Sequence, residues 1–294
     1  MISKRALHAR ARLLRDLRRF FDRRGFVEAD PPVRIRAPAP EPWIDAVRAA
    51  GGFLRTSPEL QMKRLLADGH RRIYCLGPVL RAGERGARHA EEFTMLEWYR
   101  AGADFRALQR DCEALLRAVA RRKAIRVRGA RVRIDRRFER RSVVDALAAV
   151  GVDARTASDE VWSEAMGLVV EPTLGRLRPT FLQDYPLAQG ALARRSESDP
   201  TLVERFELYV AGIELANGWT ELVDPVEQRA RFDRDRARRR ASGRDDYPLD
   251  ERFLDSLVRC PPSAGIALGV DRLLMVLTDA QTIEEVLPFP DGDL

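Results

Sequence analysis

The spacing of apolar residues along the chain predicts a mixture of helices and strands. Near the N-terminus, Leu14, Leu17 and Phe21 belong to an apolar series with three- and four-residue steps, which places its members on one face of a helix. Ser3 suits the N-cap of this helix and Gly25 suits its end. Similar spacing predicts further helices at residues 57–66, 108–120, 143–150 and 225–241 and from Asp271.

Other segments alternate apolar and polar residues, as strands with one buried face do. Residues 26–32 are expected to be extended, and the proline-rich residues 38–42 are expected to form a loop. Because the strands do not alternate regularly with helices, we predict an α+β fold in which helices flank a largely antiparallel sheet. The predicted strands are residues 73–81, 92–100, 125–127, 131–134, 207–215 and 265–270.

The positive charge of the chain is concentrated in one segment. The 294 residues carry 52 Lys and Arg against 45 Asp and Glu, a net charge of +7. Residues 117–141 alone hold twelve basic and two acidic residues, so the remainder is slightly acidic. Arginine and apolar residues alternate on both sides of Gly129, which predicts a hairpin with an arginine-lined outer face. A solvated face and a docking surface for an acidic partner both remain open, and nucleic-acid binding is less favoured.

The cysteines and histidines exclude some classes of site. Three of each are scattered along the chain without paired spacing, so we expect neither a disulfide framework nor a zinc site, and we expect a cytoplasmic location. We also expect no secretion signal and no membrane span, because charged residues interrupt every long apolar stretch.

Two strand regions carry carboxylates among apolar neighbours. Glu97 shares a strand face with Tyr99. Since an unpaired buried charge is costly, Glu97 either forms an internal ion pair with an arginine or faces a cation in a wet cleft, and both readings remain open. Glu214 and Glu221 pose the same question, and two such carboxylates could hold Mg²⁺ together with substrate phosphates.

Residues 265–272 have the features of a nucleotide site. Gly265, Ala267 and Gly269 would leave one strand face almost free of side chains, so a flat ligand could lie against the backbone. Arg272 falls in the first turn of the next helix, where a guanidinium and free amides favour a polyphosphate. A tight packing contact between sheet and helix is the structural alternative.

Together these segments resemble the catalytic domain of class II aminoacyl-tRNA synthetases, and within that class the lysyl branch. Residues 26–32, 81–100 and 265–272 are similar to the three class motifs, and residues 57–65 and 214–225 are similar to the lysyl signature. The resemblance covers nearly the whole chain. It implies the class II synthetase-like antiparallel sheet, a single catalytic domain over residues 1–294, and a homodimer.

A lysyl-tRNA synthetase also carries an N-terminal barrel that reads the anticodon, and we expect no such domain in this chain. The chain is therefore most similar to the stand-alone paralogues that ligate (R)-β-lysine to a lysine of translation elongation factor P. Ser57, residues 214–218 and Ala267 carry this finer resemblance. The implied reaction activates (R)-β-lysine or lysine with ATP as an aminoacyl-adenylate and transfers it to elongation factor P, and tRNA is not expected as a partner.

The resemblance also implies roles for individual residues. Arg81 would hold the α-phosphate and Phe93 would stack on adenine, while Arg272 would meet the outer phosphates. The implied ATP-binding residues are Arg81, Gly83, Glu84, His89, Phe93, Glu214, Leu215, Gly269 and Arg272. The implied substrate-binding residues are Ser57, Glu59, Glu97, Tyr99, Asn217, Glu221 and Ala267. The implied Mg²⁺ ligands are Glu214 and Glu221, and the implied catalytic residues are Arg81, Glu214, Glu221 and Arg272.

Two positions at the ATP end depart from the family pattern. Ala90 stands where the family usually has Asn, and Gly83 followed by Glu84 stands where it has a Glu two residues after Arg81. Two other functions remain open: a free-standing lysyl-adenylate-forming enzyme that charges tRNA or another acceptor, and a catalytically silent regulatory paralogue. The retained phosphate-binding and acidic residues argue against the silent paralogue.

Overall fold

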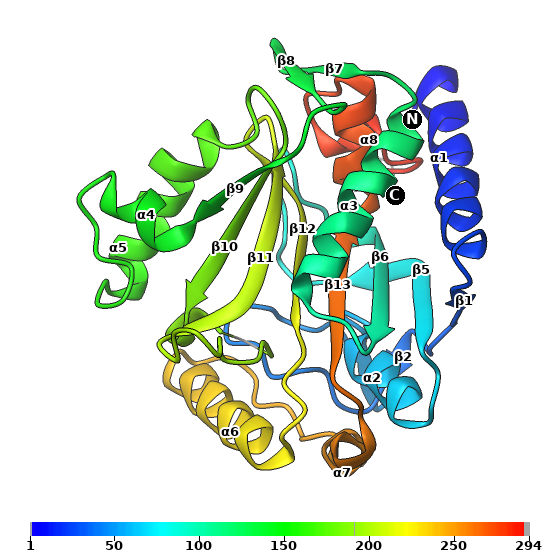
Figure 1. The fold of residues 1–294 in the computed structure, drawn as a ribbon. Helices are drawn as coiled ribbons and strands as arrows, with labels where there is room; N and C mark the ends of the chain where they lie inside the picture. The colour runs from blue at the N-terminus through cyan, green and yellow to red at the C-terminus, as the bar shows by residue number, and fades with distance from the viewer. Residues whose placement is uncertain (1, 191, 291–294) are drawn as a thin grey trace.

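The computed structural model describes residues 2–190 and 192–290, and its centre is an eight-stranded sheet (Figure 1). The inner strands are antiparallel, and only β1 and β9 at the two edges pair in parallel with their neighbours. In spatial order the strands are β1 (Val27–Glu28), β5 (Arg72–Leu80), β6 (Glu92–Ala101), β13 (Ser263–Gly269), β12 (Ile213–Thr220), β11 (Leu202–Val210), β10 (Thr180–Pro186) and β9 (Glu139–Ser142). The predicted α+β fold is confirmed.

Three helices cover one face of this sheet. Helices α1 (Lys4–Asp22), α3 (Phe105–Ala120) and α8 (Val270–Thr278) contact one another or the central strands (Figure 1). Their apolar residues join Leu96 and Trp98 of β6 and Ile266 of β13 in the main core. The opposite side-chain face of β6 and β13 is therefore left for other uses.

The other elements surround the edges of the sheet. The smaller helices are α2 (Glu59–Ala67), α4 (Val143–Ala148), α5 (Asp159–Glu164), α6 (Pro225–Ala241) and α7 (Glu251–Ser256), with short 3₁₀ or π turns at Ala165–Val170, Glu171–Thr173, Leu187–Gln189, Leu257–Arg259 and Ile283–Glu285. A small sheet is formed by β2 (Arg34–Ile35), β4 (Gly52–Leu54) and β3 (Arg48–Ala49). Within the described ranges, no helix combines the length and apolarity needed to cross a membrane.

Most predicted elements are confirmed within a few residues. The side chain of Ser3 caps α1 as expected, and Gly25 follows the helix with a φ of 69°. The helix predicted at 108–120 begins earlier, because Asp104 caps it with its own carboxylate. The helix predicted from residue 57 begins at Glu59 instead.

The strand predicted at 207–215 is wrong, because a tight turn divides this range between β11 and β12. Ala211 and Gly212 have φ values of 52° and 74°, which is the left-handed backbone of a two-residue hairpin turn. Both turn residues are small and continue an apolar run, so the alternation pattern conceals the turn.

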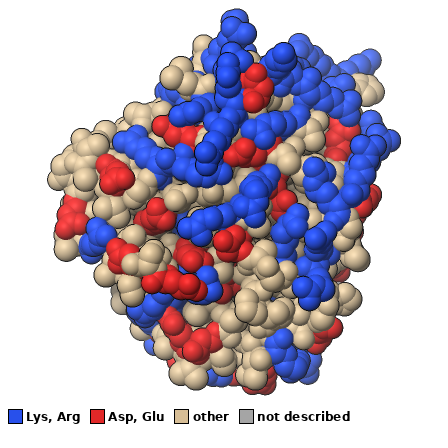
Figure 2. Space-filling view, in the orientation of Figure 1, with Lys and Arg blue, Asp and Glu red and all other residues tan. Residues whose placement is uncertain are grey.

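The predicted arginine hairpin is confirmed as β7 (Ala124–Val127) and β8 (Ala130–Arg133), and β7 packs against α8. Ile125 and Val132 are buried in the main core, whereas Arg126, Arg128 and Arg131 are exposed. Figure 2 shows basic side chains gathered over the upper part of this face, where Figure 1 places the hairpin.

Helix α1 should stabilise the sheet chiefly through Phe21. This side chain is fully buried and its ring contacts Phe26, Tyr74 and Trp98. We expect Phe21→Ala to lower the free energy of unfolding by about 3–5 kcal/mol, through lost burial and the cavity left behind. Leu7→Ala on the exposed side of α1 is the matched control and should change it by less than about 0.5 kcal/mol. Equal midpoints in urea denaturation for the two variants would contradict this role of Phe21.

Candidate functional site

One cleft brings together nearly all the residues that the sequence singled out. It lies on the face of β6 and β13 that points away from the main core. The predicted residues that line it are Ser57, Glu59, Arg81, Glu84, His89, Phe93, Glu97, Tyr99, Glu214, Leu215, Asn217, Ala267, Gly269 and Arg272. Of the predicted set, Gly83 and Glu221 are not part of the lining.

The small residues of β13 lie along the floor of the cleft and let other side chains approach its backbone closely. A Cβ atom at Gly265 would lie 2.2 Å from Cε1 of Tyr99 and 2.3 Å from Oε1 of Glu221. These distances are far inside van der Waals contact, so only glycine fits between the two side chains. At Gly265 the strand face is therefore covered by the side chains of Tyr99 and Glu221, whereas a Cβ atom at Gly269 would lie 3.8 Å from the Arg272 side chain, so the predicted open face is found only at that end.

A buried lysine joins two carboxylates beneath this end of the cleft. Lys63 is wholly buried, and its Nζ lies 2.6 Å from Oε1 of Glu59 and 2.5 Å from Oε2 of Glu221. The contacts are close ion pairs rather than well-directed hydrogen bonds. Burial acts to lower the pKa of Lys63, but the Glu221 and Glu59 carboxylates outweigh it and raise the pKa. The ammonium group therefore stays charged.

Glu97 is the carboxylate of this region that forms no ion pair with the described residues. Its two oxygens accept hydrogen bonds from Ser57 Oγ at 2.6 Å and from the Tyr99 hydroxyl at 2.9 Å, and both donors are neutral. Burial, together with the nearby charge of Glu59, raises the pKa of Glu97 to about 7. Among the described residues no arginine pairs with Glu97, so the internal ion pair considered from the sequence is wrong and the carboxylate faces the cleft.

One carboxylate oxygen of Glu221 has no hydrogen-bond donor among the described residues. Trp219 Nε1 donates to Oε2 of Glu221 at 2.9 Å, and Lys63 contacts the same oxygen. Oε1 is buried without a hydrogen-bond partner among the described residues and faces the space above Gly265. A buried acceptor without a donor is costly, so additional positive charge near Glu221 would be stabilising.

The opposite end of the cleft carries an aromatic ring and an arginine. The Arg81 guanidinium lies 5.3 Å from the centre of the Phe93 ring and donates to the carbonyl of Thr56 at 3.3 Å. Glu84 is within 3.5 Å of Arg81. Gly83 is turned away from the cleft, because its amide donates to Glu91 at 2.7 Å.

Arg272 connects three segments at this end. It donates to the carbonyl of Arg88 at 3.1 Å and lies 3.3 Å from Oε2 of Glu214. Burial and the charge of Arg272 lower the pKa of His89, which keeps the imidazole neutral at pH 7. Arginines that are partly exposed in a cleft can form charge-assisted hydrogen bonds to a polyphosphate.

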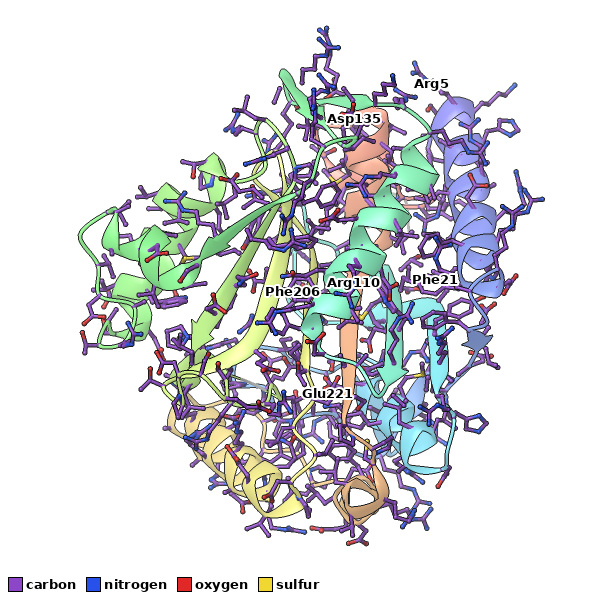
Figure 3. The ribbon with its side chains drawn as sticks, in the orientation of Figure 1. Arg5, Phe21, Arg110, Asp135, Phe206 and Glu221 are labelled. Atoms are coloured by element: carbon purple, nitrogen blue, oxygen red, sulfur yellow. The ribbon has the colours of Figure 1, made fainter. Side chains whose placement is uncertain are left out.

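The prediction that Glu214 and Glu221 share one cation is wrong. Glu214 lies near the start of β12 and Glu221 just beyond its end, and their separation of seven residues corresponds to on the order of 20 Å at the usual rise per residue. Glu221 instead pairs with Lys63. Figure 3 shows Glu221 toward the lower end of β12, away from the end where the strand begins.

Glu214 has a different acidic neighbour. The pairing of β11 with β12 shifts by one residue at Leu215, and this bulge turns Glu214 to the same side as Asn217. Burial, followed by the charge of Glu207, raises the pKa of Glu214 to about 7. Glu207 is itself buried and accepts from Tyr209 at 2.6 Å.

Sequence reasoning missed several residues of the site. Lys63 was seen only as part of a motif, and Glu207 was assigned to a strand without a role. Trp219 gave no signal, since a tryptophan in a strand is usually a core residue. Glu41 lies in the proline-rich loop at 38–42 and also lines the cleft.

Comparisons with known proteins agree with this geometry. The family model of class II tRNA synthetases (D, K and N) matches residues 2–293. The elongation factor P–(R)-β-lysine ligase of Vibrio cholerae is 37% identical over 97% of this chain and 94% of its own length, and the ligase of the same name from Edwardsiella ictaluri is 37% identical over 95% and 93%. The lysine–tRNA ligase of Moorella thermoacetica is 35% identical over 98% of this chain but 65% of its own length. The chain therefore belongs to the class II tRNA synthetase family, and within it to the branch of the elongation factor P–(R)-β-lysine ligases.

Proposed function

We propose that the protein activates (R)-β-lysine with ATP as an aminoacyl-adenylate and transfers it to a lysine side chain of translation elongation factor P. The observation that carries the proposal is the charge of the buried pocket. Among the described residues, Glu59, Glu97 and Glu221 face one buried ammonium, that of Lys63. The pocket therefore has a surplus of negative charge, and the ammonium group of a lysine-type substrate would neutralise it.

Activation needs positioning and charge stabilisation rather than a protein nucleophile. The substrate carboxylate attacks the α-phosphorus of ATP in line with the departing pyrophosphate. In our proposal Phe93 stacks on adenine, Arg81 neutralises the α-phosphate, and Arg272 with His89 contacts the outer phosphates. The cation–π arrangement of Arg81 over Phe93 and the links from Arg272 to β12 and to Arg88 support these roles, because they fix the groups before the substrate arrives.

Class II synthetase-like ligases use ATP, and we propose Mg²⁺ as its companion ion. Glu214 is the best placed ligand, because burial and the charge of Glu207 raise its pKa even though Arg272 and Arg205 act against them, so a further cation would stabilise this carboxylate. No group of three or more metal-ligating side chains occurs in the described part of the chain, which fits an ion that prefers one or two carboxylates plus substrate phosphates. When bound, the ion would neutralise phosphate charge.

Recognition of the amino acid rests on both ends of the pocket. Glu97 and Tyr99 would bind the side-chain ammonium, with Ser57 and Glu59 above them, and Asn217 would lie toward the reacting carboxylate. Ala267 adds a methyl group to the cleft lining where lysyl-tRNA synthetases usually have glycine. This methyl lies at the backbone end of the substrate in our proposal, where α-lysine and (R)-β-lysine differ.

Further proposals concern the setting of the reaction. We propose that residues 1–294 act as one catalytic domain, which the continuous eight-stranded sheet, with β1 at one edge and β9 at the other, supports. We also propose a homodimer, on the resemblance of residues 26–32 to the class motif of the dimer interface. A cytoplasmic location fits Cys75, Cys112 and Cys260, which are free thiols.

A second candidate function is charging of tRNA with lysine, which the similarity to the Moorella lysine–tRNA ligase favours. To separate the two functions, ATP–pyrophosphate exchange should be faster with (R)-β-lysine than with α-lysine. Purified elongation factor P should become labelled when the amino acid is radioactive, whereas tRNA should not. Arg272→Ala is the negative control and should lower exchange by about 10²-fold or more, because a preorganised charge at the phosphates is lost. Preferred labelling of tRNA would overturn the main proposal.

The pH dependence of lysine binding should report on Glu97. Because its pKa is raised to about 7 in the folded protein, lowering the pH through 7 protonates the carboxylate and removes the partner of the substrate ammonium. We expect KM for (R)-β-lysine in the exchange assay to rise toward tenfold per pH unit below 7. Glu97→Gln should bind weakly at every pH from 5.5 to 8.5. A flat profile for the wild-type protein would contradict the assignment.

The two interpretations of the arginine hairpin can be separated by experiment. Arg126, Arg128 and Arg131 are exposed and form no ion pairs with described residues, whereas Arg133 pairs with Asp135 at 2.8 Å. If the outer face docks an acidic partner, replacing Arg126, Arg128 and Arg131 by serine should raise KM for elongation factor P several-fold. The remaining KM should also depend less on salt concentration than that of the wild-type protein. Exchange should not change. An unaltered KM would identify a solvated face.

A further inference from the structure

Glu41 is the acidic group of the cleft that has no partner. It lies on the loop between β2 and β3, is half-buried and lines the cleft. Within the described ranges its carboxylate makes neither a hydrogen bond nor an ion pair, and its oxygens are not sealed from the open cleft. A carboxylate held in this way is available to a ligand.

The loop that carries Glu41 is fixed by a buried arginine. Arg239 of α6 is fully buried, and its Nη1 donates to the carbonyls of Glu41 at 2.7 Å and Ile44 at 2.8 Å. Its Nη2 contacts Asp45 at 2.7 Å. Because one planar guanidinium holds three points of the loop, the backbone at Glu41 has little freedom to turn the side chain away.

The other acidic side chains in the cleft lining already have partners. Glu59 pairs with Lys63, Glu84 with Arg81 and Glu214 with Arg272. Glu97 accepts from Ser57 and Tyr99. Asp271 holds the amide of Thr94 and pairs with Arg10. Glu41 is thus the carboxylate that the activation step leaves unused.

The electrostatic surroundings of Glu41 keep it close to its titration point at neutral pH. Burial raises its pKa to about 7. The charges of Arg81 and Arg205 act against this shift, while Glu59 and Asp235 add to it. A carboxylate with such a pKa can both accept a proton and release it again during turnover.

We propose that Glu41 is the general base of the transfer step, an inference that rests on the proposed function. The acceptor lysine of the partner protein first loses one proton to water. Its neutral nitrogen then attacks the carbonyl carbon of the adenylate, so that the C–N bond forms, the C–O bond breaks, and AMP leaves with the electron pair. The second proton of the attacking nitrogen passes to a carboxylate oxygen of Glu41, which later releases it to solvent.

The test compares the two half-reactions in Glu41→Gln, which keeps the shape of the side chain. ATP–pyrophosphate exchange with (R)-β-lysine reports on activation, and single-turnover transfer from preformed adenylate to elongation factor P reports on the second step. We expect the ratio of transfer rate to exchange rate to fall by about 10²-fold or more. Glu92→Gln removes an exposed carboxylate outside the cleft lining and should leave the ratio unchanged.

A chemical rescue distinguishes a base from a merely structural group. Acetate added to Glu41→Ala should restore part of the transfer rate without raising exchange. An unchanged ratio of transfer rate to exchange rate in Glu41→Gln would overturn the proposal. A parallel rise in KM for (R)-β-lysine in the exchange assay would also overturn it, because Glu41 would then be a binding group for a substrate amine. Failure of the wild-type protein to activate either lysine would instead refute the proposed function itself.

Discussion

The buried ammonium of Lys63 determines how one end of the site is built. A charge that is removed from water must be paired, or the fold loses several kcal/mol. Lys63 meets this requirement with Glu59 on its own helix and with Glu221 just beyond β12. The Lys63–Glu221 pair joins α2 to the end of β12, and because no second lysine is buried among the described residues, Glu97 is left to a cation from outside.

The proposed binding sites for the nucleotide and the amino acid lie at two ends of one face of the sheet. On β6, Phe93 lies at the end that we propose for the nucleotide and Glu97 at the end that we propose for the amino acid. The small residues of β13 run between them, and the strand passes directly into α8 with Arg272 in its first turn. A carboxylate bound at one end and a phosphate bound at the other would therefore meet above Ala267 and Gly269, where a Cβ atom at Gly269 would come no nearer than 3.8 Å to another side chain.

The parts of this design that sequence reasoning recovered are those with a local pattern. The faces of β6 and β13 follow from strict alternation, and the cap of α1 follows from one serine. The turn at Ala211 was missed because small apolar residues resemble a continuing strand. The bulge at Leu215 was missed for a related reason, and it places Glu214 on a face that alternation alone would not assign.

The pairing errors have another origin. Glu214 and Glu221 look equivalent in the sequence, because nothing local shows that Glu221 pairs with Lys63 while Glu214 pairs with Arg272. Long-range partners of this kind depend on which strands are neighbours, and that order is a property of the whole sheet. The same limit concealed Glu41, whose position depends on a contact from α6.

The arginine content of the chain has a structural use that the net charge does not reveal. Besides Arg239, the buried Arg55 donates to the carbonyls of Pro31 and Pro78, and the buried Arg231 donates to that of Ala193. A guanidinium is suited to this task because its fixed donors can satisfy several backbone oxygens of an irregular segment at once. Arg239 in this way holds the loop that carries Glu41 and Ile44 of the cleft lining, so an arginine that looks like surface charge in the sequence instead fixes one wall of the site.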